Sequence, residues 1–210
     1  PFYIKPDLVA PGAFINTTDI NGEYKISSGT SFAAPHVAGT AALILQKNPE
    51  LTPQEVKSIL MTTTDIVYDQ FNDRFPIEVS GNGRIDVSKA INAELIIMPP
   101  NLIFDLSSTN QIQTKHLKIN GIDGESMSIR FEESHIADFN YDLDDENLVI
   151  NAKLTEQSLG KFESRIIINH NEIDYHIPII VRVSEGAITI NEDGGKLRID
   201  VSSPSTWSYA

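Results

Sequence analysis

A serine that opens a helix of small residues is the feature of this sequence best suited to covalent chemistry. Ser31 begins the segment 31–47, which is rich in Ala and Leu and ends before Pro49. The first backbone N–H groups of a helix have no partner within the helix and lie at the positive end of its dipole. Such groups can stabilise the oxyanion of a tetrahedral intermediate, which a serine nucleophile generates during acyl transfer. The sequence therefore indicates Ser31 as a candidate nucleophile.

The residues around Ser31 fit that role. Gly29 has no side chain and would let a substrate approach the backbone closely. Pro35 has no N–H, so the Ser31 carbonyl would lack its usual helical donor. A serine at the start of a helix is often only an N-cap, however, and the position of Ser31 alone leaves that alternative open.

Three segments, in a fixed order, carry a resemblance to a known family. They are KPDLVAPG at residues 5–12, GTSFAAPHVAG at residues 29–39 and GNGRIDVSKAI at residues 81–91. The second resembles the serine motif GTSMAxPHVAG of subtilisin-like serine proteases, with Phe32 in place of Met. The first resembles the segment that precedes that serine, and the third the turn and helix that close the peptidase domain. The chain thus resembles the C-terminal part of a subtilase (peptidase family S8), followed by an accessory β domain.

The resemblance implies a serine endopeptidase that cleaves polypeptides through a Ser-His-Asp triad. Ser31 would attack the scissile carbonyl, a histidine would accept its proton, and an aspartate would orient the histidine. The Ser31 N–H and an asparagine side chain would form the oxyanion hole. Ser28, Gly29 and Thr30 would lie at the substrate cleft, although Ser28 is equally well explained as a turn residue.

The triad partners implied by this resemblance are not found in the sequence. In subtilisins the Asp, the His and the oxyanion Asn all precede the serine, and no Asp-x-Gly or His-Gly-Thr motif occurs here. His36 is no substitute, because five residues along a helix place it about 140° around the axis from Ser31. We therefore expect a fragment that is inactive by itself, with the missing groups supplied by upstream sequence.

Two other functions remain alternatives. The chain would be a non-catalytic binding or adhesion protein if the subtilase scaffold is degenerate and Ser31 is a relic. An esterase-type serine hydrolase is disfavoured, because Ser31 is followed by Phe32-Ala33 and no G-x-S-x-G elbow is present.

The first part of the chain mixes strand and helix signals, which favours an α/β fold. Residues 5–10 predict a strand, and residues 31–47, 51–63 and 86–93 predict helices. The second helix has Thr52 as its expected N-cap, with Glu55 completing a capping box. By resemblance, residues 1–95 form the C-terminal portion of a doubly wound parallel sheet. Asp7 is read as a structural residue of the first strand.

Beyond residue 95 the pattern changes to alternation of apolar and polar residues. This period of two predicts an antiparallel β-sandwich over residues 96–185, similar in architecture to fibronectin type III modules. Residues 186–210 predict a hairpin about Asp193-Gly194-Gly195 and the start of a further, truncated β module. The strand positions expected from alternation are Leu102, Phe104 and Leu106; Met127, Ile129 and Phe131; Leu148, Ile150, Ala152 and Leu154; Ile166 and Ile168; and Ile177, Ile179, Val181 and Val183.

The charge of the chain limits its partners. The formal net charge is −13, and residues 1–93 carry 7 basic and 10 acidic side chains whereas the rest carry 9 and 19. This acidity argues against nucleic-acid binding, which needs Lys and Arg against phosphates. No apolar run is long enough for a membrane span. We expect a secreted or cell-surface protein whose signal peptide would lie upstream; the oligomeric state stays open.

No cofactor or metal site is predicted. The chain has no cysteine, which excludes thiolate ligands. Residues 138–146 are similar to a calcium loop, but Leu143 stands where the turn needs glycine, so an acidic hairpin or loop is the favoured reading. Asp65, Asp69 and Asp73 are also spaced for a loop, and calcium remains an option without a placed site. Asn16-Thr17-Thr18 is a glycosylation sequon.

Overall fold

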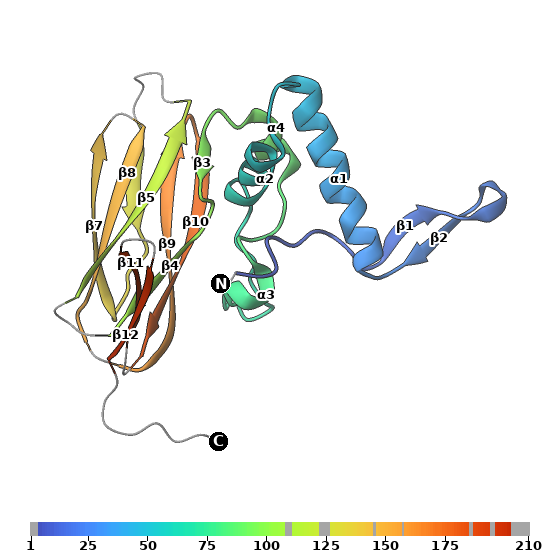
Figure 1. The fold of residues 1–210 in the computed structure, drawn as a ribbon. Helices are drawn as coiled ribbons and strands as arrows, with labels where there is room; N and C mark the ends of the chain where they lie inside the picture. The colour runs from blue at the N-terminus through green and yellow to red at the C-terminus, as the bar shows by residue number, and fades with distance from the viewer. Residues whose placement is uncertain are drawn as a thin grey trace.

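The computed structural model shows a helical part and a two-layered β part that pack against each other (Figure 1). It describes residues 4–107, 111–121, 127–144, 146–156, 158–184, 187–193 and 196–202; only the backbone of the last two ranges is described. Among the described helices, none is long and apolar enough to cross a membrane.

The helical part contains four helices and a short β-ribbon. Figure 1 shows α2 and α4 between the β part and α1, with the β1-β2 ribbon beyond α1. The elements are β1 (Ile15–Thr18), the 3₁₀ turn η1 (Ile20–Gly22), β2 (Tyr24–Ser27), α1 (Thr30–Lys47), α2 (Pro53–Thr62), α3 (Ile77–Ser80) and α4 (Val87–Asn92). The three predicted helices are confirmed, and the short α3 was not predicted.

The capping box predicted for α2 is present. The Thr52 side chain accepts from the Glu55 N–H at 3.3 Å, and the Glu55 carboxylate accepts from the Thr52 N–H at 2.7 Å. Pro53 occupies the first helical position, where its missing N–H costs nothing. The apolar face of α2 then packs into a small core of the helical part, whose buried members are Ile44, Val56, Ile59, Leu60, Ile85 and Ala90.

Residues 5–10 do not form the predicted strand. Only Val9 pairs, through a parallel bridge to Arg84, and Arg84 also bridges antiparallel to Asp65. The described part of residues 1–93 therefore contains a three-segment strip held by Asp65, Arg84 and Val9 in place of a wider parallel sheet. Among the described residues, Val9 has no β partner other than Arg84, so the parallel ladder is not extended.

The β part consists of two four-stranded sheets, in the orders β4-β10-β9-β6 and β3-β5-β8-β7, and a separate hairpin β11-β12. The strands are β3 (Ile96–Met98), β4 (Leu102–Leu106), β5 (Ile112–Asn120), β6 (Ser128–Phe131), β7 (Ala137–Asp144), β8 (Asn147–Leu154), β9 (Gly160–His170), β10 (Ile173–Val183), β11 (Ala187–Asp193) and β12 (Lys196–Ser202). The predicted final hairpin is confirmed in its backbone pairing.

The two sheets enclose one apolar core, as the alternation predicted. Leu148, Ile150 and Ala152 of β8 are fully buried, and so are Ile177 and Ile179 of β10. Of the predicted strand positions, only Met127 lies outside its strand. Strands β3, β5 and β7 were not predicted as such. Residues 138–144 of the acidic segment lie in β7, which pairs with β8 and places Asp144 opposite Asn147, so the hairpin interpretation is confirmed.

One strand pair departs from the antiparallel expectation. Strand β4 runs parallel to β10, with Leu102 opposite Ile179. More than 65 residues separate these strands along the chain, so no short turn dictates their direction. This pairing also accommodates Pro178 within β10, because β4 begins only at the position opposite Ile179 and Pro178 has no β4 partner to which it would donate.

The outer face of the β4-β10-β9-β6 sheet is covered by the helical part. Ile180 of this sheet is buried together with Ile4 and Ile77 of the helical part. Three alternate residues of β9 also reach across: Lys161 forms an ion pair with Glu78, the Glu163 carboxylate accepts from the Ile77 N–H at 2.9 and 3.0 Å, and Arg165 donates to the Asn82 carbonyl at 3.1 Å. We call Lys161, Glu163 and Arg165 the β9 polar row.

The chain segment that joins the two parts is held from both sides. The Tyr175 hydroxyl of β10 accepts from the N–H groups of Glu94 and Leu95, at 2.9 and 3.1 Å. The Ser58 hydroxyl of α2 donates to the Ile97 carbonyl at 2.5 Å. The boundary predicted at residue 95 thus falls within a set of contacts that spans both parts.

The turn at residues 81–83 is tightly enclosed. Gly81 and Gly83 have φ angles of +59° and +139°, which side chains rarely adopt. A Cβ on Gly83 would lie 2.2 Å from the Asp65 carbonyl oxygen. Between them, the Asn82 side chain is fully buried and donates to the Pro100 carbonyl at 2.9 Å.

We predict that Gly83→Ala destabilises the chain by more than about 3 kcal/mol, because both the backbone conformation and the Asp65 carbonyl exclude a Cβ. Urea unfolding followed by circular dichroism measures this change. Gly39→Ala is the matched control, since a Cβ there meets nothing within 4 Å and lies within α1. It should change stability by no more than about 1 kcal/mol. Equal midpoints for the Gly83→Ala and native chains would contradict the prediction.

His176 makes the junction sensitive to acid. The residue is 7% exposed, and its Nδ1 has no hydrogen-bond partner among the described residues. Burial and the positive charges of Arg165 and Lys89 lower the pKa of His176 to about 4, against the opposing influence of Asp174 and Glu132. The unfolded chain therefore takes up a proton near pH 6.5 that the folded chain refuses until about pH 4.

We predict that this difference costs stability as the pH falls through that window, by up to about 3 kcal/mol near pH 4. His176→Gln should remove the cost, so the variant should lose less stability than the native chain between about pH 7 and pH 4.5. Urea unfolding at both pH values provides the comparison. Identical losses in the two chains would show that His176 is not the responsible group.

Candidate active site

Ser31 is the second residue of α1 and does not cap it. Thr30 is the first helical residue, and the N-cap is Gly29, whose φ of +152° favours glycine. No side chain caps this helix end, so the first-turn N–H groups are not occupied by a capping oxygen. The N-cap interpretation of Ser31 is therefore wrong, and the residue is left next to free backbone donors.

The Ser31 side chain is exposed, as are Ser28, Gly29 and Thr30. Its hydroxyl has no hydrogen-bond partner among the described residues. A serine hydroxyl becomes a strong nucleophile when a base accepts its proton. Within this chain, Ser31 is accessible and oriented by the helix, but it is not activated.

The backbone before Ser31 is fixed by the segment 5–12. The Gly29 N–H donates to the Gly12 carbonyl at 2.7 Å. A Cβ on Gly12 would lie 2.9 Å from the Gly29 carbonyl oxygen and 3.2 Å from the Ala33 Cβ. Glycine at position 12 therefore lets this segment approach the start of α1 closely enough to hold it.

Ser28 has a structural contact in addition to its predicted role at the substrate cleft. Its hydroxyl accepts from the Phe14 N–H at 2.9 Å, which ties the end of the ribbon to its beginning. The substrate-binding role of Ser28, Gly29 and Thr30 remains a prediction. All three are exposed: Ser28 and Gly29 directly precede α1, and Thr30 is its first residue.

Two further residues of α1 behave as the sequence indicated. The His36 Nδ1 lies 2.8 Å from the Phe32 carbonyl, so the imidazole bonds back to its own helix. Pro35 lies within the helix and offers no N–H to the Ser31 carbonyl. The other four histidines, at positions 116, 135, 170 and 176, all lie in the β part. The described residues therefore bring neither a base nor an acid to Ser31.

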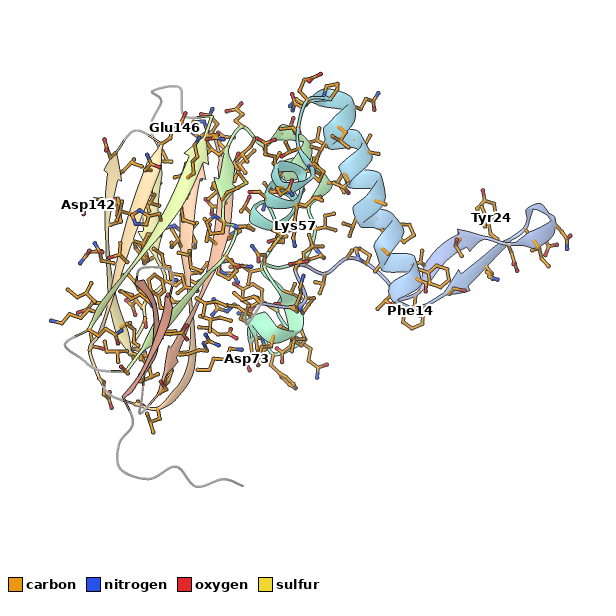
Figure 2. The ribbon with its side chains drawn as sticks, in the orientation of Figure 1. Phe14, Tyr24, Lys57, Asp73, Asp142 and Glu146 are labelled. Atoms are coloured by element: carbon orange, nitrogen blue, oxygen red, sulfur yellow. The ribbon has the colours of Figure 1, made fainter. Side chains whose placement is uncertain are left out.

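The β1-β2 ribbon projects away from the rest of the molecule beside the start of α1. Figure 2 shows Phe14 at its base and Tyr24 along its length, and these side chains are 82% and 69% exposed. Asn16 of the glycosylation sequon is exposed on the same ribbon. The ribbon was not predicted from the sequence, because its strands have only four residues each and little alternation.

The aspartates considered for calcium have other partners. Burial by itself would raise the pKa of Asp65, but ion pairs with Lys89 (2.6 Å) and Arg84 (3.2 Å) hold it below its ordinary value. Asp69 accepts from the N–H groups of Phe71 and Asp73, as in a turn. In the part of the chain that the structure describes, no three His, Asp or Glu residues are grouped to hold a metal ion.

Asp7 is a structural residue, as its position in the 5–12 segment suggested. Burial opposes its ionisation, yet contacts with Lys5 (2.6 Å) and Lys57 (3.1 Å) hold the pKa of Asp7 below its ordinary value. Figure 2 places Lys57 on α2, facing this segment. The two lysines thus hold the beginning of the segment 5–12, whose last residue, Gly12, contacts Gly29.

Comparison with known proteins agrees with this geometry. The model of the subtilase family matches residues 1–93. Over about 130 residues the chain is 33% identical to the Subtilisin-like protease SBT1.4 of Arabidopsis thaliana, covering 50% of this chain and 15% of that protein. It is 33% identical to the Minor extracellular protease Vpr of Bacillus subtilis, covering 46% and 13%, and 37% identical to the Serine protease AprX of the same species, covering 41% and 22%. Residues 1–93 are thus similar to the subtilase family, and the chain spans less than a quarter of the length of each of these relatives.

The β part has only weak structural likeness to solved proteins. Titin domain M7 aligns with 43% of this chain at 8% identity, with a TM-score of 0.34 and coverage of 93% of the titin domain. Likeness at this level assigns no fold family, so the fibronectin-like classification of the sandwich stays a prediction.

Proposed function

We propose that this chain is part of a subtilisin-type serine endopeptidase in which Ser31 is the nucleophile. The observation that carries the proposal is the position of Ser31: exposed, second in an uncapped helix, and not used as the cap. A serine that only stabilised its helix would place its oxygen on the N–H groups of the first turn. Here no side chain occupies the N–H groups of the first turn; the Phe32 N–H donates to the Gly29 carbonyl at 3.0 Å, and the Ser31 N–H is proposed to bind a substrate oxygen.

In the proposed reaction, the Ser31 oxygen attacks the scissile carbonyl of a polypeptide and its proton passes to a histidine. The tetrahedral oxyanion is stabilised by the Ser31 N–H and by an asparagine amide. Collapse releases the amine, which takes the proton from the histidine, and leaves an acyl-enzyme that water hydrolyses. The histidine, its orienting aspartate and the asparagine are proposed to come from sequence before residue 1. The reaction itself requires no cofactor.

The proposed substrates and location follow from the family. Subtilisin-like proteases cleave polypeptides, and Ser28, Gly29 and Thr30 would line the cleft that receives them. One of the matched relatives is named an extracellular protease, which supports a secreted or cell-surface location for this protein. The acidic charge of −13 does not favour a nucleic-acid partner.

We predict that a fluorophosphonate labels Ser31 in the full-length protein that contains this chain. Peptide mass mapping should place the adduct on Ser31, and Ser31→Ala should abolish it, because no other serine would be activated. The isolated chain of 210 residues should not react, since it provides no base.

Ser28→Ala should keep the adduct, since Ser28 is proposed to contact substrate and not to be attacked. A folded full-length protein that gives no adduct would favour the alternative, a binding or adhesion protein on a degenerate subtilase scaffold.

A further inference from the structure

Arg165 belongs to the β part, but its side chain ends inside the helical part. It is 1% exposed, and its Nη1 donates to the Asn82 carbonyl at 3.1 Å. Its Nε lies 4.0 Å from the Glu132 carboxylate, which also forms an ion pair with Arg74. A guanidinium buried this deeply requires fixed partners, so its position constrains the group that it contacts.

That group is the turn at residues 81–83. The Asn82 carbonyl accepts two hydrogen bonds, from Arg165 and from the Thr64 hydroxyl at 2.9 Å. The Asn82 side chain donates to the Pro100 carbonyl, so the residue is held from the helical part and from the β part together. Loss of the guanidinium would leave the buried carbonyl with one donor.

The turn at residues 81–83 also holds the segment 5–12 through backbone hydrogen bonds. The Asn82 N–H donates to the Asp7 carbonyl at 3.0 Å, and the Val9 N–H donates to the Gly83 carbonyl at 2.9 Å. The Ile85 N–H donates to the Val9 carbonyl, also at 2.9 Å. Three consecutive bonds therefore fix the path of this segment relative to the turn.

The segment 5–12 ends at the nucleophile. The Gly12 carbonyl accepts from the N–H of Gly29, which lies two residues before Ser31, at 2.7 Å. Gly12 also packs closely against Gly29 and Ala33. A continuous series of contacts thus runs from Arg165 through Asn82, Val9 and Gly12 to the start of α1.

We propose that Arg165 is a positioning residue for Ser31: the β part fixes the nucleophile through the Asn82 turn. This inference rests on the proposed function for its catalytic consequence. Rates of acyl transfer depend steeply on alignment, and a displacement of about 1 Å can cost on the order of 100-fold. The contacts reach the backbone of Gly29, two residues before Ser31, so we expect the loss of alignment to appear chiefly in kcat.

The test uses the full-length protein with Arg165→Met, which removes the donor but keeps an apolar side chain. Glu132 retains Arg74 in this variant. We expect kcat on a peptide substrate to fall about tenfold or more, with KM changed less than about twofold. Arg165→Lys keeps a charged donor and should recover kcat to within about threefold of the native value. Lys161→Met, on the same face of β9, is the control and should leave kcat unchanged.

Hydrogen exchange supplies a readout that does not need activity. The amides of residues 7–14 and 28–32 should exchange faster in Arg165→Met than in the native protein or in Lys161→Met. If Arg165→Met does not fold, Arg165→Leu, which also lacks a donor, replaces it with the same expectations.

Each outcome has a distinct meaning. A folded Arg165→Met protein with native kcat and native exchange would overturn the inference, as would a loss that Arg165→Lys does not recover. If the native protein has no activity and no fluorophosphonate adduct, the proposed function fails, and exchange alone decides whether Arg165 holds the Ser31 segment.

Discussion

The structure depends on a buried guanidinium that crosses from one part of the molecule to the other. Arg165 is placed by a strand of the sandwich, yet its charge is satisfied by the Asn82 carbonyl and, at longer range, by Glu132. A buried cation without such partners would cost several kcal/mol. The two parts are therefore bound to one mutual arrangement, in which the outer face of the β4-β10-β9-β6 sheet meets the turn at residues 81–83.

That arrangement explains why one sheet of the sandwich is buried on both faces. Ile166 and Ile168 face the inner core, whereas Ile167 between them is also only 4% exposed. On the outer face, the β9 polar row pairs with the helical part and Ile180 joins Ile4 and Ile77. Burial of apolar area and satisfaction of polar groups thus act at the same surface, so the sandwich stabilises the helical part as well as itself.

Ser31, the proposed nucleophile, lies on a helix that is packed far less closely. Helix α1 buries only Thr40 and Ile44, while Leu43 and Leu45 remain 43% and 39% exposed. Its start is held chiefly by backbone contacts with Gly12 and by the Ser28–Phe14 bond. The backbone before Ser31 is consequently held by the strip of Val9, Arg84 and Asp65. That strip is in turn held by the sandwich. The exposed apolar side chains of α1 support the proposal that further parts of the peptidase domain complete the site.

The sequence by itself determined the features that depend on local patterns. The capping box of Thr52 and Glu55, the small-residue helix after Gly29 and the alternation of β8 and β10 all follow from neighbouring residues, and all three are present. The serine motif likewise indicated Ser31 without reference to any distant residue. The short strands β1 and β2 escaped detection because four residues carry too little periodicity.

Only the tertiary structure decided which surfaces meet. Lys161, Glu163 and Arg165 alternate as a solvent-facing strand would, and nothing in their spacing distinguishes a wet face from a buried, paired one. The direction of β4 beside β10 and the docking of Asn82 depend on residues more than 60 positions apart. Such long-range pairings follow from the burial and hydrogen bonding of the whole chain, which local sequence patterns do not encode.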